Sequence, residues 1–271
     1  MRPNALIIRT AGTNCDRELA FAFELAGAAA FSVHLNELIA KPHLVEKADL
    51  IGFPGGFSYG DDIAAGRIYA NRLKHRLLEP LKEAIKCSVP IIGICNGFQV
   101  LVKTGLLPDP DAGRQTATLT DNTSGRFTDK WISLVVPEHT VSIWTTGVSR
   151  LDLPIAHGEG RFVPESDEEL RALQVSGQIA LRYDLVEGGF PGNPNGSTDE
   201  IAGVSDPTGL VLGLMPHPER FTHPTHHPHW TRWAAERLAE TPAGLKLFQN
   251  AVQFVNRRMA EKRREREQAL A

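Results

Sequence analysis

The sequence has few cysteines, little net charge and no long apolar run, and each of these absences excludes a class of protein. The chain has only three cysteines, Cys15, Cys87 and Cys95. This small, odd number excludes a disulfide-built secreted scaffold and a four-cysteine zinc site. A formal net charge of −3 lacks the basic excess that a general nucleic-acid binder normally carries. No apolar run approaches the roughly 20 residues of a membrane-spanning helix. We therefore expect neither nucleic acid nor membrane among the partners of this chain.

The remaining composition is that of an ordinary globular protein. The chain has 271 residues, of which 42% are hydrophobic, and this is enough to bury a sizeable core. Its first residues enter a short apolar run without the longer apolar stretch and cleavage site of a signal peptide. We expect a cytoplasmic protein with reduced thiols. Because no segment resembles a flexible linker, we predict one domain at residues 1–256, followed by a charged C-terminal helix end or tail at residues 257–271.

Apolar runs alternate with amphipathic stretches through the first half of the chain. The runs predict strands at 4–9, 31–35, 49–53 and 89–94, and the amphipathic stretches predict helices at 16–28, 73–86 and 96–104. This alternation indicates βαβ units and a mostly parallel sheet with both faces covered by helices. The second half predicts further strands at 131–136, 178–183, 200–204 and 210–215, and a closing helix at 242–259.

One cysteine stands where a buried strand meets a helix, in the pattern Gly93-x-Cys95-x-Gly97. This pattern is typical of a nucleophile elbow with sulfur in place of the hydroxyl group. The flanking glycines allow close backbone approach around a strained residue, and the following helix N-terminus favours the thiolate form of cysteine. The pattern alone is also compatible with a small buried hydrophobic residue, the common fate of free cysteine.

A thiol nucleophile needs a base, and the base needs a group that orients it. His217 and Glu219 follow a predicted strand, and prolines at 216 and 218 favour an extended backbone that places both side chains on one side. The pair then completes a triad with Cys95. Four more histidines fall in a proline-broken stretch without cysteine or acidic ligands, so we expect a polar surface loop and no metal site there: His223, His226, His227 and His229.

A glycine-rich stretch at 52–62 follows another predicted strand and should lie beside the elbow. A glycine pair in such a loop can direct a backbone N–H toward a developing oxyanion. The stretch matches neither phosphate-binding pattern, G-x-x-x-x-G-K-[ST] or G-x-G-x-x-G. Taken alone, it is also compatible with a plain loop.

Together these elements resemble the class I (triad) glutamine amidotransferases, and most closely the glutaminase subunits of phosphoribosylformylglycinamidine synthase. The most specific stretches are Pro-Gly-Gly-Phe-Ser-Tyr-Gly-Asp at 54–61 and Ala-His-Gly-Glu-Gly at 156–160. Further matching residues lie at 12–16, 95–99, 195–197, 199–203, 215–220 and 244–249, and residues 122–131 resemble the form of this domain that is fused to the synthase. The resemblance thus spans nearly the whole chain.

The resemblance implies a flavodoxin-like α/β fold, with a mostly parallel central sheet flanked by helices and an additional antiparallel part. It implies hydrolysis of L-glutamine to glutamate and ammonia, with Cys95 as nucleophile, His217 as proton shuttle and Glu219 as its orienting group. The amides of Gly56 and Asn96 would form the oxyanion hole. The residues implied in positioning glutamine are Gln99, His157, Gly158 and Glu159.

The same resemblance implies a partner, because this chain contains no ATP-using synthase domain. Ammonia would pass to a large synthase subunit, which would carry ATP and magnesium, and a small accessory subunit is expected beside it. No cofactor is expected on this chain itself. Apparent extra residues at 107–130, 137–152 and beyond 256 leave the partner interface open. The alternatives are an amidotransferase that serves another pathway, another cysteine hydrolase of the same fold, and a non-catalytic binding module.

Overall fold

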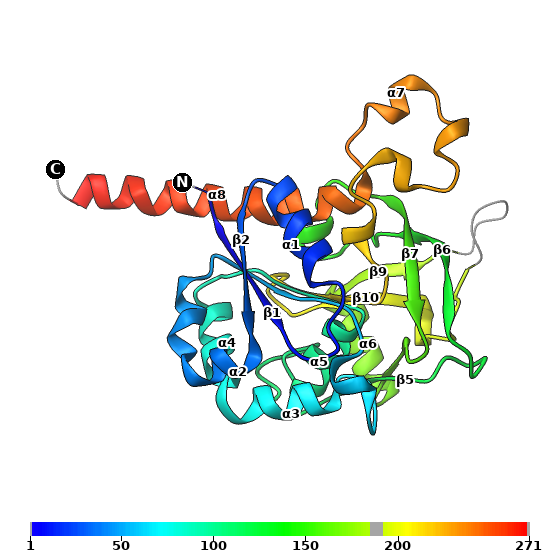
Figure 1. Ribbon diagram of the computed structural model, residues 1–271, viewed down its shortest axis with the longest axis horizontal. Coiled ribbons are helices and arrows are strands. Elements are labelled where there is room, and N and C mark those ends of the chain that lie inside the picture. The colour runs from blue at the N-terminus through cyan, green and yellow to red at the C-terminus, as the bar shows by residue number, and fades with distance from the viewer. Residues whose placement is uncertain (1, 185–191, 270–271) are drawn as a thin grey trace.

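A computed structural model of the chain, shown in Figure 1, describes residues 2–184 and 192–269. Its centre is a nine-stranded sheet with the strand order β2-β1-β3-β4-β11-β10-β9-β6-β7. The first five strands in that order are parallel: β2 (Ala29–His34), β1 (Asn4–Arg9), β3 (Leu50–Phe53), β4 (Ile91–Ile94) and β11 (Val211–Leu214). The other four pair antiparallel: β10 (Ile201–Ser205), β9 (Ile179–Tyr183), β6 (Thr128–Val135) and β7 (Arg150–His157). A separate two-stranded antiparallel sheet joins β5 (Ala117–Thr120) to β8 (Arg161–Pro164).

Helices cover both faces of the parallel part of the sheet. The α-helices of the described residues are α1 (Asp16–Leu25), α2 (Leu35–Ala40), α3 (Arg67–Arg76), α4 (Leu78–Lys86), α5 (Asn96–Thr104), α6 (Asp167–Val175), α7 (Ala235–Leu238) and α8 (Ala243–Ala269). Among them, α1, α5 and α8 contact the parallel strands directly, whereas α6 contacts β8 and α7 lies in the stretch between β11 and α8. A Cβ added to Gly52 would meet the α1 residues Leu19 and Phe23, whereas the next strand residue, Phe53, lies against Gly97 of α5. Since neighbouring strand residues point to opposite faces, α1 and α5 lie on opposite faces of the sheet.

The core explains why the central strands are apolar throughout. All four residues of β3, β4 and β11 are buried, as expected of parallel strands covered on both faces. On one face the ring of Phe23 meets the rings of Phe248 and Trp144 edge-on, at centroid distances of 5.1 and 6.4 Å. These contacts pack α1 against α8, which lie beside each other in Figure 1.

The α/β class, the helix-flanked parallel strands and the antiparallel part agree with the prediction, and the antiparallel strands continue the same sheet. The single helix predicted at 73–86 is wrong, because the chain forms α3 and α4 with a break at Leu77. Pro80 accounts for the break: its ring would clash with the carbonyl of Arg76 in a continuous helix, and it is tolerated in the first turn of α4.

The closing helix is longer than predicted and runs ten residues past 259, to Ala269, with residues 260–269 exposed. Its charged end projects beyond the sheet in Figure 1. Residues 270 and 271 of the predicted tail lie outside the described part of the chain. None of the helices within residues 2–184 and 192–269 combines the length and the apolar character that crossing a membrane requires.

Candidate active site

Cys95 occupies the turn between β4 and α5, with φ 51° and ψ −107°. This positive φ is strained for a residue with a side chain, and such strain concentrates at functional sites. A Cβ on Gly97 would come within 2.0 Å of the Phe53 carbonyl oxygen, and one on Gly93 within 2.8 Å of the Gly97 backbone. The two flanking glycines therefore have the close-approach role that the sequence pattern predicts. The turn places the sulfur at the carboxyl end of the parallel strands, next to the N-terminus of α5.

His217 and Glu219 form a buried hydrogen-bonded pair directly after β11. The imidazole Nδ1 lies 2.6 Å from Glu219 Oε1, and the His217 amide donates to the Pro154 carbonyl of β7 at 2.8 Å. The pairing agrees with the sequence prediction, but the predicted extended backbone does not. His217 instead precedes a 3₁₀ turn at Pro218–Arg220, and its hydrogen bond to Glu219 spans the start of that turn.

The imidazole of His217 stands between two thiols and a carboxylate. Burial by itself lowers the pKa of His217. The charge of Glu219 and hydrogen bonds with Cys15, Cys95 and Glu219 outweigh it and hold that pKa well above its usual value. A Cβ on Gly55 would lie 2.9 Å from His217 Cε1 and 3.4 Å from Cys95 Cβ. Gly55 therefore lines the contact between nucleophile and base, and the pair is suited to form a thiolate and an imidazolium.

The second thiol at this site, Cys15, has no assigned role in the sequence interpretation. It is 1% exposed, and its Sγ accepts a hydrogen bond of 3.1 Å from Arg220 Nη2. Ligand atoms of Cys15, His217 and Glu219 lie within 4.8 Å of one another. That spacing also suits a metal ion, but His217 and Glu219 are bonded to each other, so we assign the group to the hydrogen-bonded pair. Nothing local in the sequence signals the contact, because Cys15 and Arg220 are 205 positions apart.

A cavity of about 210 Å³ opens beside Cys95. Five of the residues predicted to bind substrate or oxyanion line it: Gly56, Gln99, His157, Gly158 and Glu159. Asn96 is not among its lining residues, but its side chain joins the wall by donating to Gln99 Oε1 at 2.9 Å. Gln99 Nε2 in turn donates to the Glu159 carbonyl at 2.6 Å. The amide side chains thus tie α5 to the loop after β7 and shape the cavity.

The two predicted oxyanion donors are the residue that follows the nucleophile and a residue of the loop that lines the cavity with it. Gly56 has a φ of 140°, and a Cβ there would come within 2.7 Å of the Asn14 nitrogen, so only glycine fits this position. Asn96 is the first residue of α5, where a helical amide has no carbonyl four residues earlier to bind. Both amides are therefore suitable donors for a developing oxyanion.

His157 is a neutral histidine with a fixed tautomer. Burial, and next the positive charge of His217, lower the pKa of His157 to about 4. Its Nδ1 lies 3.1 Å from Asn122 Oδ1, which also accepts from the Gly160 amide, while Asn122 Nδ2 donates to two carbonyls. The amide orientation is thereby set, so Nδ1 carries the proton and Nε2 has a free lone pair. At neutral pH this ring can only accept a hydrogen bond at Nε2.

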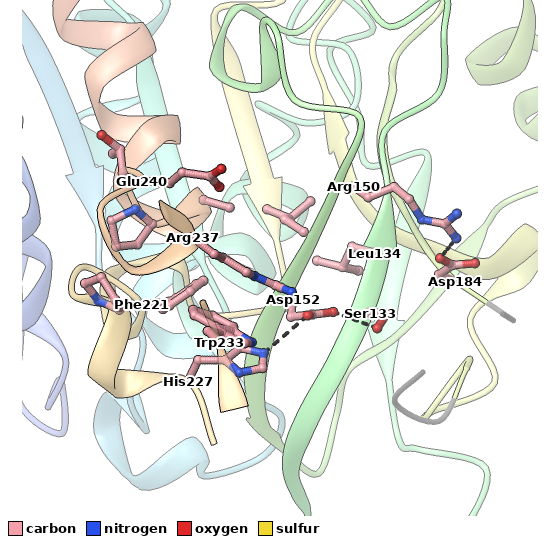
Figure 2. A pocket seen from close by; sticks show the side chains of 15 residues that line it. Ser133, Leu134, Arg150, Asp152, Asp184, Phe221, His227, Trp233, Arg237 and Glu240 are labelled. Atoms are coloured by element: carbon pink, nitrogen blue, oxygen red, sulfur yellow. Dashed lines mark hydrogen bonds and ion pairs between the residues drawn. The ribbon is translucent and has the colours of Figure 1, made fainter. Parts of the chain in front are cut away.

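The histidine-rich stretch near 223–229 differs from the expected surface loop at one position. Three of these histidines are exposed: His223, His226 and His229. His227 is buried, and its ring centroid lies 4.4 Å from that of Trp233. Its Nε2 lies 3.2 Å from Asp152 Oδ2. Figure 2 shows this pair in a second cavity, of about 360 Å³, where Asp152 also accepts a hydrogen bond from Ser133. His227 therefore joins its loop to β7.

Residues 2–255 match the protein family described as the CobB/CobQ-like glutamine amidotransferase domain. It is 46% identical to phosphoribosylformylglycinamidine synthase subunit PurQ of Dehalococcoides mccartyi over 249 residues, which cover 92% of this chain and 96% of the relative. The PurQ subunit of Methanococcus maripaludis strain C5 is 39% identical over 271 residues, covering 95% and 100%. The chain belongs to the PurQ family of glutamine amidotransferases.

A solved structure supports the same assignment for the fold. A chain in the PurLQS structure from Thermotoga maritima superposes with a TM-score of 0.70 at 32% identity, covering 94% of this chain and 100% of that chain. The match to the CobB/CobQ-like glutamine amidotransferase domain includes the elbow, the His–Glu pair and the loop at 54–61, since all of them fall within residues 2–255. The α/β architecture and the amidotransferase class that the sequence motifs predict are therefore confirmed.

Proposed function

We propose that Cys95, His217 and Glu219 catalyse the hydrolysis of L-glutamine to glutamate and ammonia. The observation that carries this proposal is the strained Cys95 turn facing a buried imidazole–carboxylate pair at a cavity of amino-acid size. The Cys95 sulfur attacks the side-chain carbonyl carbon, and a γ-glutamyl thioester forms as the C–N bond breaks. The amides of Gly56 and Asn96 stabilise the oxyanion of each tetrahedral intermediate.

His217 moves the protons in both halves of the reaction. His217 takes the proton of the Cys95 thiol, and its raised pKa favours the resulting imidazolium, which can protonate the leaving ammonia. The neutral imidazole that remains then removes a proton from the water that attacks the thioester. Glu219 keeps the proton on Nδ1 and stabilises the cation each time it forms. Gln99, Gly158 and Glu159 shape the cavity wall, and His157 offers an acceptor lone pair.

As a PurQ-family glutaminase subunit, the chain supplies ammonia for the conversion of formylglycinamide ribonucleotide to its amidine in purine biosynthesis. We propose a large synthase subunit as the partner that binds ATP and magnesium, and a small accessory subunit beside it. The proposed place of action is the cytoplasm. We propose that residues 1–256 form the amidotransferase domain and that residues 257–271 are a charged C-terminal helix end or tail.

The test compares ammonia release from glutamine by the chain alone and with its synthase partner. We expect weak hydrolysis alone and faster hydrolysis in the complex, because docking can complete the site and a lone glutaminase would waste nitrogen. Cys95→Ala should abolish glutamine-dependent amidine formation while ammonium chloride still supports it. Glutaminase activity that survives Cys95→Ala would refute the mechanism. Ammonia delivery to a different acceptor would instead favour an amidotransferase of another pathway.

A further inference from the structure

The cavity at Cys95 is lined by charges of both signs. Three carboxylates, from Asp61, Asp121 and Glu159, share its wall with one guanidinium, from Arg126. Glutamine carries its charges only on the α-ammonium and the α-carboxylate, at the opposite end from the reacting carboxamide. A cavity that holds the carboxamide at Cys95 must therefore also accommodate one cation and one anion. Neither Asp61 nor Arg126 belongs to the residues that the sequence interpretation assigns to substrate.

Asp61 is fixed close to the nucleophile through the residue that follows Cys95. It ends the 3₁₀ turn Ser58–Asp61 with a φ of 52°. Its Oδ1 accepts hydrogen bonds from Asn96 Nδ2 at 3.0 Å and from the Gly66 amide at 3.4 Å. Within the described part of the chain, its Oδ2 accepts no hydrogen bond, so this oxygen is available to a ligand in the cavity.

The other two carboxylates are less suited to bind the ammonium. Both oxygens of Glu159 lie near the Ala65 amide, at 3.4 and 3.2 Å, so this carboxylate holds the loop before α3. Asp121 is exposed and lines a neighbouring cavity as well as this one. Asp61 is therefore the carboxylate that combines a fixed position, partial burial and a free oxygen.

Arg126 lies in a turn that is tied to the end of β7. Asn122 Nδ2 donates to the carbonyls of Arg126 and His157, both at 2.9 Å, so one amide joins the turn to the cavity wall. The Arg126 amide also donates to Ser124 Oγ at 3.3 Å. Among the residues that the structure describes, the Arg126 guanidinium forms no ion pair, although it lines the cavity. A planar guanidinium without a partner suits a carboxylate ligand.

We propose that Asp61 binds the α-ammonium group of glutamine and that Arg126 binds its α-carboxylate. This assignment rests on the proposed glutaminase function and makes both residues determinants of substrate specificity. The head group is then held from two loops, at 58–61 and 122–126, that lie on opposite sides of the elbow in the sequence. A substrate lacking either charge would lose one of these contacts.

Two truncated substrates separate the roles of the two residues. 4-Aminobutanamide keeps the ammonium and lacks the carboxylate, and glutaric acid monoamide keeps the carboxylate and lacks the ammonium. The measured quantities are kcat and KM for glutamine and the competitive inhibition constant of each analogue, for the wild type, Asp61→Asn and Arg126→Gln. Asp62→Asn is the matched control, because it removes the neighbouring exposed carboxylate, which does not line the cavity. Thermal denaturation of each variant checks that it is folded.

We expect Asp61→Asn to raise KM for glutamine by about 10- to 100-fold with little change in kcat, the effect of losing one charged hydrogen bond. It should raise the inhibition constant of 4-aminobutanamide by the same factor and leave that of glutaric acid monoamide unchanged. Arg126→Gln should raise KM for glutamine by a similar factor. It should raise the inhibition constant of glutaric acid monoamide and leave that of 4-aminobutanamide unchanged. Asp62→Asn should change neither KM nor the inhibition constants. If either variant raised the inhibition constants of both analogues equally, or left KM for glutamine unchanged, the assignment would be overturned.

The pH dependence of KM gives an independent readout. Burial raises the pKa of Asp61 to about 6; the Gly66 amide hydrogen bond opposes this, and the negative charge of Glu159 adds to it. Asn96 and the Lys103 ammonium, which also face the carboxyl group, lower that pKa. Since only the ionised form attracts an ammonium, KM of the wild type should rise as the pH falls through about 6. In Asp61→Asn this rise should be absent, and its persistence would contradict the role of Asp61. A wild type that does not hydrolyse glutamine would refute the proposed function, and this assignment with it.

Discussion

Substituting Glu219 by glutamine removes the negative charge from the buried pair while keeping the shape of the side chain. The structure sets the size of the effect, because Glu219 Oε1 lies 2.6 Å from His217 Nδ1 and both side chains are buried. Opposite charges about 4 Å apart attract by about 4 kcal/mol at an effective dielectric constant of 20. Because the imidazolium forms as the thiol, and later the water, loses its proton, losing that attraction corresponds to about a 1,000-fold lower kcat. The glutamine amide can also donate to Nδ1 and impose the wrong tautomer.

The assay is ammonia release from glutamine across a range of pH, with the synthase partner present. In Glu219→Gln the pKa of His217 should fall, because the charge that raises it is gone. An imidazolium that deprotonates at lower pH makes the alkaline loss of activity begin at lower pH, in addition to the lower kcat. The chain offers a matched control in Asp152→Asn, which alters another histidine–carboxylate pair, His227–Asp152, seen in Figure 2.

Asp152→Asn should leave kcat and its pH profile unchanged, because its histidine is not the one that contacts Cys95. A Glu219→Gln variant that is folded and retains near-normal kcat would show that Glu219 does not stabilise the imidazolium during the reaction. So would a lower kcat with an unshifted alkaline limb, since that result would give Glu219 a structural role without an effect on the imidazolium.

Two further predictions concern the surroundings of the nucleophile. Gly55→Ala should lower kcat by about 100-fold without unfolding the protein, because the added Cβ would lie 2.9 Å from His217 Cε1 and force the imidazole away from Cys95. Steady-state kinetics measures kcat, and thermal denaturation checks the fold. An unchanged kcat would contradict the prediction. A glutamine-derived chloroketone should alkylate Cys95 and leave Cys15 and Cys87 unmodified, since Cys95 is the one of these three that lines the substrate cavity. Peptide mass spectrometry identifies the alkylated residue. Alkylation of Cys15 instead of Cys95 would contradict the assignment of Cys95 as the nucleophile.

Local patterns in the sequence predict the parts of this protein that depend on neighbouring residues. The elbow follows from an apolar strand, two glycines and a helix start, all within a few residues of Cys95. The His217–Glu219 contact was also predictable from its spacing, although a 3₁₀ turn rather than an extended strand produces it. The two backbones differ because Pro218 tolerates the first position of a helical turn as readily as an extended segment.

Contacts between distant segments were not predictable in the same way. β7 alternates buried and partly buried residues around Pro154, and its residues pair with β6 residues that lie 15 to 29 positions earlier in the chain. Cys15 reaches Arg220 only through the packing of α1 against the turn after β11. Asp61 and Arg126 come from separate loops, and only the folded chain places both on one cavity. Periodicity and spacing carry no signal for such pairs.

The most direct test of the mechanism is to trap the covalent intermediate. The wild-type chain, with its synthase partner, is mixed with glutamine and quenched in acid within the first turnover, and the peptides are then analysed by mass spectrometry. We expect a single γ-glutamyl adduct, on the peptide that contains Cys95, and no adduct in Cys95→Ala. Rapid ammonia release with Cys95 unmodified, or an adduct on Cys15, would contradict the claim that Cys95 is the nucleophile.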